Sequence, residues 1–233
     1  AFDSLGFWQG APLLIAAAVF ATWLAVEQTT VGGLDEMPDR TAGPGRISRR
    51  LLARALTGFV YGASEAILTA WAVLFLVERH QAPLGIAAGA LSSFWLAMTA
   101  GRLGGAAVLR WISPLRLALL LCLGASASCL LIAGSNGSAG AIFRFGCAGL
   151  FFSAVFPLLL GLASGEAPRQ TPKVTAVFNA ATLAGIGLGS FGVGPLRPAL
   201  GLVRIYEFNA ILPLIVAVLL VTLRRRAPRA TRG

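Results

Sequence analysis

Long apolar runs, separated by short polar segments, dominate this chain. A helix rises about 1.5 Å per residue, so each run matches the roughly 30 Å hydrocarbon core of a bilayer. No period-two alternation of a β-strand competes with them. The pattern predicts an all-α integral membrane protein with spans at residues 7–26, 51–76, 84–109, 115–133, 139–162, 174–193 and 208–223.

One connection is much longer than the others. Residues 27–50 read EQTTVGGLDEMPDRTAGPGRISRR, which is polar, of mixed charge, and interrupted by Gly and Pro. Such composition is typical of a linker. We therefore expect a single helix within residues 1–26, a linker at 27–50, a block of six helices at 51–223 and a basic tail at 224–233.

Composition supports a membrane protein rather than a soluble one. Of the 233 residues, 57% are hydrophobic and only 12% are charged, against about a quarter charged in a soluble domain. The net charge of +10 is explained by arginines that flank membrane helices, so we expect the lipid bilayer as a partner and no nucleic acid.

The basic residues gather in alternate loops, which predicts orientation. The intervening loops hold only Arg79, Arg197 and Arg204. By the positive-inside rule the basic-rich loops and the tail are cytoplasmic, which we expect at a cell inner membrane. The cytoplasmic set is Arg40, Arg46, Arg49, Arg50, Arg110, Arg116, Arg169, Lys173 and the five arginines from Arg224 onward.

One carboxylate, Glu65, lies near the middle of the span at 51–76. Arg54, Gly58, Tyr61 and Thr69 share its helix face at steps of three or four residues. A charged group at this depth is costly unless it is partnered, hydrated or protonated. The stripe predicts a water-accessible pathway; the alternative is a buried helix contact in which Glu65 pairs with an arginine.

Polar residues also divide the six-helix block into two triplets. Glu65 and Arg102 lie in the first two spans of one triplet, Arg144 and Asn179 in the first two of the other, and the third span of each has no interior charge. Consecutive three-helix units have opposite topology, so the pattern predicts two inverted three-helix repeats, which are common in secondary transporters.

Glycines predict close helix contacts. The pairs are Gly58–Gly62, Gly101–Gly105, Gly161–Gly165 and Gly185–Gly189, each with the spacing that lets helix backbones approach. The run GIGLGSFGVGP at 185–195 is denser still. It predicts either a bending, gating helix or a tightly packed helix end.

Three motifs together resemble the major facilitator superfamily, and within it the fucose permease-type sugar transporters. They are YGASE at 61–65 followed by Trp71, AGRLGG at 100–105 running to Arg110, and GLFFS at 149–153 followed by FP at 156–157. They are similar to the seventh, eighth and tenth helices of such transporters. Their order is that of a C-terminal half.

The resemblance implies twelve helices in two six-helix domains, with a central substrate site and alternating access. Residues 1–26 would hold the sixth helix of a missing N-terminal half, residues 27–50 the central cytoplasmic linker, and residues 51–223 the C-terminal domain. The expected function is secondary active transport of a small polar solute, with a sugar as one candidate, coupled to protons. The alternatives are a membrane receptor or scaffold that kept the fold, and an intramembrane enzyme.

Four residues are candidates for the substrate or proton pathway. Glu65 could accept hydrogen bonds from substrate hydroxyls or carry a proton. Tyr61 and Trp71 suit a sugar, as a hydroxyl partner and an apolar ring face, although Trp71 lies on another face from Glu65 and could equally be core packing. Asn179 could contact substrate or hydrogen-bond a neighbouring helix.

Two arginines are candidates for gating. Arg102 lies near the cytoplasmic end of its span, and Arg110 closes the same motif. The family resemblance implies a cytoplasmic gate or domain contact there. The alternative for Arg102 is a side chain that snorkels to the headgroups, which is also what we expect of Arg144 near the outer end.

No catalytic or metal motif appears in the sequence. There is no HExxH, Ser/His/Asp set or phosphate-binding loop, and Cys122, Cys129 and Cys147 have no metal-ligand spacing. We expect no cofactor and no metal, packing roles for the cysteines, and a solvated turn around His80.

Overall fold

The computed structural model describes residues 48–225 continuously, together with residues 17, 20, 21 and 24. The chain divides into two units, 1–46 and 47–233, and the second is described below. Most of the predicted span at 7–26, most of the linker at 27–50 and nearly all of the tail at 224–233 lie outside the described residues.

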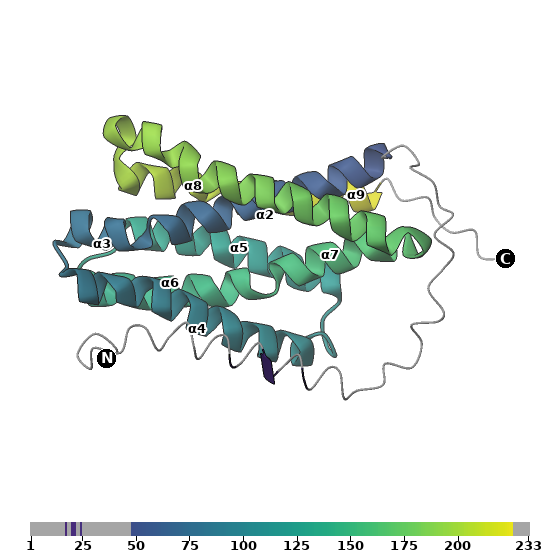
Figure 1. Ribbon diagram of the computed structural model, residues 1–233, viewed down its shortest axis with the longest axis horizontal. Helices are drawn as coiled ribbons and strands as arrows, with labels where there is room; N and C mark the ends of the chain where they lie inside the picture. Colours follow the sequence, from purple (N-terminus) through teal and green to yellow (C-terminus); the bar gives the residue numbers. More distant parts are fainter. Residues whose placement is uncertain (1–16, 18–19, 22–23, 25–47, 226–233) are drawn as a thin grey trace. The chain divides into compact units, whose positions relative to one another are not determined.

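Every regular element within residues 48–225 is helical, as predicted (Figure 1). Ser48 caps the first helix by accepting a hydrogen bond from the Leu51 amide at 3.1 Å. The helices are α2 (Arg49–Ala70), α3 (Ala72–His80), α4 (Leu84–Val108), α5 (Pro114–Ala133), α6 (Ser138–Ser153), α7 (Val155–Gly165), α8 (Thr171–Asn209) and α9 (Ile211–Arg225), with a 3-10 turn, η3, at Pro168–Gln170.

Two of the crossings contain a break, and a third break separates two crossings. Trp71 separates α2 from α3, Ala154 separates α6 from α7, and Gly201 interrupts α8 with φ 72° and ψ 157°. Five stretches are long and apolar enough to cross a membrane, and the last of them, Pro168–Arg224, spans 57 residues. Because the chain turns back at Gly201, that stretch crosses twice, which gives the six-helix block its six crossings.

Contacts with α2 and α3 show that the chain reverses its direction at Gly201. Arg197, before the turn, pairs with Glu78 near the end of α3. Tyr206, after it, donates its hydroxyl to the Leu68 carbonyl at 3.1 Å. The chain therefore runs parallel to α2 and α3 up to Gly201 and antiparallel to them afterwards.

The predicted end of the sixth span was wrong. Helix α8 continues past residue 193 and through Pro195 and Pro198. Each proline removes one amide donor, but both lie near the end of the crossing, where few helical bonds remain to be lost. The sharp break occurs at Gly201, whose positive φ suits glycine, and not within the glycine run at 185–195.

The helix packing confirms the inverted repeat. The most extensive contacts join α2 to α8 and α4 to α6, and Figure 1 shows α8 lying along α2. These pair the first crossing with the fifth and the fourth with the second. The two triplets correspond crossing by crossing, the first to the fourth and the second to the fifth. Replacing each crossing by its counterpart therefore turns the α2–α8 pair into the α6–α4 pair. The first crossing of each triplet also carries a break, at Trp71 and Ala154.

Glycines make both of these contacts close. A Cβ atom at Gly185 would lie 2.0 Å from the Phe59 carbonyl oxygen, and one at Gly149 would lie 2.1 Å from that of Phe94. The predicted roles of Gly58–Gly62 and Gly185–Gly189 are confirmed, since all four meet atoms of the facing helix. The Gly161–Gly165 prediction is wrong, because a Cβ at either position would meet nothing within 4 Å.

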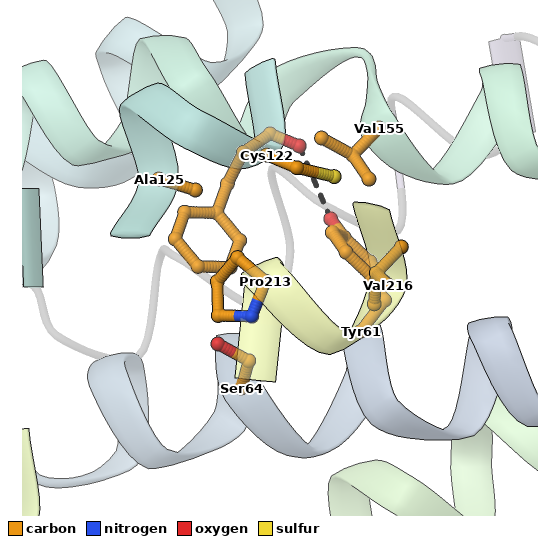
Figure 2. A pocket seen from close by; sticks show the side chains of 8 residues that line it. Tyr61, Ser64, Cys122, Ala125, Val155, Pro213 and Val216 are labelled. Atoms are coloured by element: carbon orange, nitrogen blue, oxygen red, sulfur yellow. Dashed lines mark hydrogen bonds between the residues drawn. The ribbon is translucent and has the colours of Figure 1, made fainter. Parts of the chain in front are cut away.

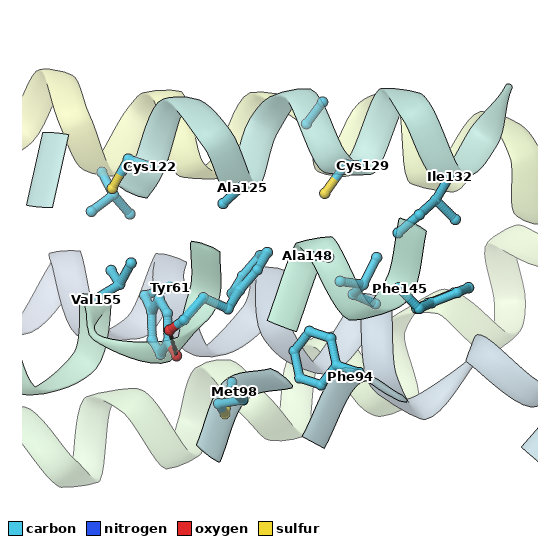
Figure 3. Close-up of a cluster of buried hydrophobic side chains, with 14 of the residues drawn as sticks. Tyr61, Phe94, Met98, Cys122, Ala125, Cys129, Ile132, Phe145, Ala148 and Val155 are labelled. Atoms are coloured by element: carbon cyan, nitrogen blue, oxygen red, sulfur yellow. Dashed lines mark hydrogen bonds between the residues drawn. The ribbon is translucent and has the colours of Figure 1, made fainter. Parts of the chain in front are cut away.

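Aromatic side chains fill the core between the helices (Figure 3). The rings of Phe75 and Tyr206 lie 4.9 Å apart, and Phe145 lies 6.1 Å from Tyr206. Helix α5, which has no charge in its interior, is more buried than α4. In the apolar 18-residue stretch of α5, 44% of the residues are buried, against 22% in that of α4. The reason is that α5 packs on α6, α7, α8 and α9.

The close α2–α8 contact predicts different effects for two neighbouring glycines. Gly185→Ala should lower stability by about 1–3 kcal/mol, because the added methyl overlaps a backbone oxygen that cannot move alone. Gly187→Ala is the control: a Cβ there meets nothing within 4 Å, so stability should be unchanged or slightly higher. Thermal unfolding of the purified protein in detergent measures both. Equal melting temperatures for the two variants would contradict the close contact.

Candidate functional site

The site is built on the break at Ala154. Ala154 has φ −102° and ψ 0°, so the helical hydrogen bonds around it are interrupted. Pro157 has no amide hydrogen, and it stands where the helical donor to the Ser153 carbonyl would be. In a membrane such a carbonyl must find a partner within the protein.

Side chains from two other helices supply the partners. Arg102 of α4 donates from Nε to the Ser153 carbonyl at 3.2 Å. Tyr61 of α2 donates its hydroxyl to the Phe152 carbonyl at 3.2 Å, the bond drawn in Figure 2. The break thus ties three crossings together through one tyrosine and one arginine.

Glu65 lies one helical turn beyond Tyr61. It is half-buried near the middle of the crossing formed by α2 and α3, and it interacts electrostatically with Tyr61 and Arg102. Among the residues that the structure describes, no ion pair within 4 Å involves Glu65. A carboxylate held near a cation without a closed ion pair can accept hydroxyl hydrogen bonds or exchange a proton.

The predicted stripe does not form one water-facing surface. Arg54 is 6% exposed and pairs with Glu166. Gly58 packs against Phe178 of α8, and Tyr61 is 4% exposed. The stripe is more open toward the end of α2, where Glu65 and Thr69 are half-buried. The Thr69 hydroxyl donates to the backbone carbonyl oxygen of Glu65 at 2.9 Å. The sequence pattern identified the polar residues correctly, but residues of α6, α7 and α8 and Glu166, which follows α7, pack on α2 and cover most of that face.

Among the described residues, no hydrogen bond or ion pair joins the other pathway candidates, Trp71 and Asn179, to Glu65. Trp71, at the α2–α3 break, donates from Nε1 to the Ser190 carbonyl at 3.2 Å and so joins α2 to α8. Asn179 is half-buried on α8, next to the buried Phe178. The structure therefore shows a helix contact for Trp71, and the substrate roles of both residues stay predictions.

The arginine candidates differ in their surroundings. Arg110 is exposed in the turn after α4, with its guanidinium 5.6 Å from the centre of the Trp111 ring. Arg144 donates to the Leu131 carbonyl at 2.5 Å, so it makes a helix contact. Of these arginines, Arg102 alone interacts with Glu65 among the described residues.

Sequence reasoning missed two buried polar residues. Asn209 is 2% exposed and donates from Nδ2 to the Ser64 carbonyl at 3.0 Å. Ser64 is 1% exposed, and within the described part of the chain neither its hydroxyl nor the Asn209 Oδ1 atom has a partner. An asparagine just inside the predicted span at 208–223 was the available signal.

A small cavity lies beside Tyr61 and Ser64, bounded also by Cys122 and Pro213 (Figure 2). Its volume is about 10 Å³, which is about the least that can hold a water molecule. Glu65 does not line it. This cavity is too small for a sugar, so a solute would need a larger space bounded by Glu65.

His80 differs from the expected solvated turn. It is half-buried, its Nε2 atom lies 2.9 Å from the Ser135 hydroxyl, and its ring contacts Phe75 edge-on at 5.7 Å. Within the described residues, no three His, Cys, Asp or Glu side chains gather as metal ligands.

Comparison with known proteins identifies the family. The sequence profile of the Major Facilitator Superfamily matches residues 4–190. The chain belongs to the major facilitator superfamily. It is therefore a multi-pass membrane protein of a transporter family. No curated protein matches the sequence.

Solved structures share the fold. A crystal structure of the superfamily transporter FucP in the outward conformation has a TM-score of 0.76 at 22% identity, covering 92% of this chain and 54% of that one. A single-residue variant of the E. coli fucose:proton symporter FucP has a TM-score of 0.68 at 20% identity, covering 76% and 43%. The chain thus spans about half the length of these transporters.

Arg102 provides a test of the site. Arg102→Ala should cost about 1 kcal/mol of stability, because the Ser153 carbonyl loses its donor, and uptake should fall if Arg102 gates. Arg110→Ala, which removes an exposed cation of the same motif, should leave stability unchanged. Melting temperature and uptake at equal expression measure the two effects. Unchanged stability and uptake in Arg102→Ala would contradict both the hydrogen bond and the gating role, and would favour an Arg102 side chain that only reaches the lipid headgroups.

Proposed function

We propose that this chain forms the C-terminal six-helix half of a secondary active transporter. It moves a small polar solute by alternating access and couples that movement to protons. The observation that supports the proposal is that Glu65 lies one helical turn from Tyr61 and within electrostatic reach of Arg102, because those two residues also hold the break at Ala154.

The chemistry follows from the competition for Arg102. An ionised Glu65 attracts the guanidinium, whereas a protonated Glu65 leaves it on the Ser153 carbonyl. Since Ser153 precedes the break between α6 and α7, the charge of Glu65 biases the hydrogen bonds that hold α6 relative to α4. A proton or a substrate hydroxyl bound at Glu65 would then alter helix packing, as alternating access requires.

A sugar is the solute class that we propose. One structural neighbour is described as a fucose:proton symporter, and a carboxylate suits a ligand rich in hydroxyl donors. The motifs at 61–65, 100–105 and 149–157, which resemble fucose permease-type transporters, support the same class. A receptor or scaffold gains nothing from a half-buried carboxylate at this depth.

The proposed arrangement keeps the division predicted from the sequence. Residues 1–26 hold the sixth helix of the N-terminal half, 27–50 the cytoplasmic linker, 51–223 the C-terminal domain and 224–233 a cytoplasmic tail at the inner membrane. The open face of α4 supports a partner half. Only 22% of its apolar window is buried within this chain, and Arg102 is exposed on this helix.

Glu65 variants test the proposal. Glu65→Gln keeps shape and hydrogen bonding but removes titration, so proton-driven uptake should be lost while substrate exchange persists. Glu65→Ala should also weaken binding, by about 1–3 kcal/mol through the lost hydrogen bond. Uptake and exchange of labelled L-fucose and other hexoses are measured in cells that express the chain within its complete reading frame.

Two other outcomes would change the role of Glu65. If Gln serves as well as Glu, the residue binds hydroxyls and carries no proton. If uptake is normal in both variants and only the melting temperature falls, Glu65 is a structural partner of Arg102 and lies outside the transport site. Asp at position 65 controls for side-chain length, because it keeps the titratable group.

A further inference from the structure

A second, larger cavity lies at the end of the helix block that the basic residues predict to be cytoplasmic. Its volume is about 560 Å³, within the range of small-molecule sites. It lies where α2 and α8 begin and where α7 and α9 end. Glu65, Tyr61 and Arg102 do not line it, so it is distinct from the proposed transport site.

The mouth of this cavity is basic. Among the described residues, Arg49, Arg50 and Arg54 line it, and Glu166 is the one carboxylate. Arg54 is 6% exposed and engages Glu166 through Nε, at 3.2 Å, and Nη2. That bidentate pair neutralises one charge of each sign, so among the described lining residues Arg49 supplies the positive charge on which the argument rests. An anionic ligand is therefore favoured.

The polar groups around the mouth can hold an anion. The first amides of α2, a helix of 22 residues, face this end, and α8 also begins here, next to the lining residue Gln170. Helix N-termini carry partial positive charge and free amide donors. Arg49 adds a guanidinium, whose fork of donors matches phosphate oxygens.

The inner wall of the cavity is apolar. It consists of Leu51, Ala53, Ala163, Ala167, Val174 and Leu223. Leu51, Ala163 and Val174 are buried, so this wall belongs to the interior of the bundle. A free anion would use only the mouth, whereas a phosphate that carries an apolar tail would use both parts.

We propose that this cavity binds a phosphate group attached to an apolar moiety, as in the headgroup of an anionic glycerophospholipid. The inference does not rest on the proposed transport activity. Basic pockets between membrane helices on the cytoplasmic side are suited to such headgroups. A bound lipid would join the ends of α2, α7, α8 and α9.

The probes separate the phosphate from its tail. The full chain, purified in a neutral detergent, is titrated with dioleoylphosphatidylglycerol, with dioleoylglycerol, which lacks the phosphate, and with inorganic phosphate. The lipid phosphate should raise the melting temperature in a saturable manner, because a ligand of the folded state stabilises it. Dioleoylglycerol should have little effect.

Variants locate the site. Arg49→Gln removes a lining charge, and Ala53→Phe fills the cavity without changing charge. Each should weaken the apparent affinity for phosphatidylglycerol by about tenfold, as expected for a charge-assisted hydrogen bond or blocked space. Arg169→Gln and Ala70→Phe are the matched controls, since both residues are exposed and neither lines the cavity. Their affinities should stay within about twofold of wild type.

Each result decides the proposal. If inorganic phosphate raises the melting temperature with the same dependence on Arg49 and Ala53, the ligand source is a soluble phosphate ester. If phosphatidylglycerol raises it and inorganic phosphate does not, the source is the lipid. If Arg169→Gln weakens binding as much as Arg49→Gln, only the general basic surface attracts lipid and the site is refuted. Absence of stabilisation by any phosphate-bearing probe would also refute it.

Discussion

The structure depends on one constraint, that backbone carbonyls inside a bilayer must be hydrogen-bonded within the protein. The crossing formed by α6 and α7 breaks at Ala154, and Pro157 removes a donor just beyond it. Arg102 and Tyr61 satisfy the carbonyls of Ser153 and Phe152. Tyr61 and Arg102, which we propose to act together with Glu65, are therefore also the residues that hold the helices at this break.

The helices around this break are closely packed. Glycines bring α2 against α8, and α4 against α6, so closely that an added methyl would overlap backbone atoms. Two tyrosines, Tyr61 and Tyr206, donate to carbonyls near helix breaks from fully buried positions. In the proposed mechanism, closely packed pairs of parallel helices with polar bonds at their breaks let a local change in hydrogen bonding move a whole crossing.

Much of the fold could be predicted from the sequence because apolar length and period are strong signals. They predicted the crossings at 84–109 and 115–133 nearly to the residue. The GxxxG pairs at 58–62 and 185–189 predicted close helix contacts, but which helices meet there became clear only from the structure. The turn between the last two crossings was predicted within residues 194–207 and lies there, at Gly201. The helix ends on either side of it were wrong, because local Gly and Pro density does not reveal where neighbouring helices support a helix end. Arg54 was placed on the pathway because spacing alone cannot show that Glu166, distant in sequence, pairs with it.

The candidate site was predicted less well than the fold. Glu65 and Arg102 were recognised separately, since an ionisable residue in a span is conspicuous, but their proximity depends on how α4 packs against α6. Asn209 and Ser64 were overlooked because neutral polar residues hardly interrupt an apolar run. The Trp71 indole makes a helix contact that the sequence left undecided between packing and ligand binding.

The central claim is that Glu65 and Arg102 act on each other, and a double-mutant cycle tests it most directly. The free energies of unfolding of Glu65→Gln, Arg102→Gln and the double variant are compared with that of the wild type. Coupled residues show interaction energies of about 0.5–3 kcal/mol, whereas independent sites add. The account predicts a coupling in that range that weakens when the pH is low enough to protonate Glu65 in the wild type. Strict additivity at every pH would contradict it.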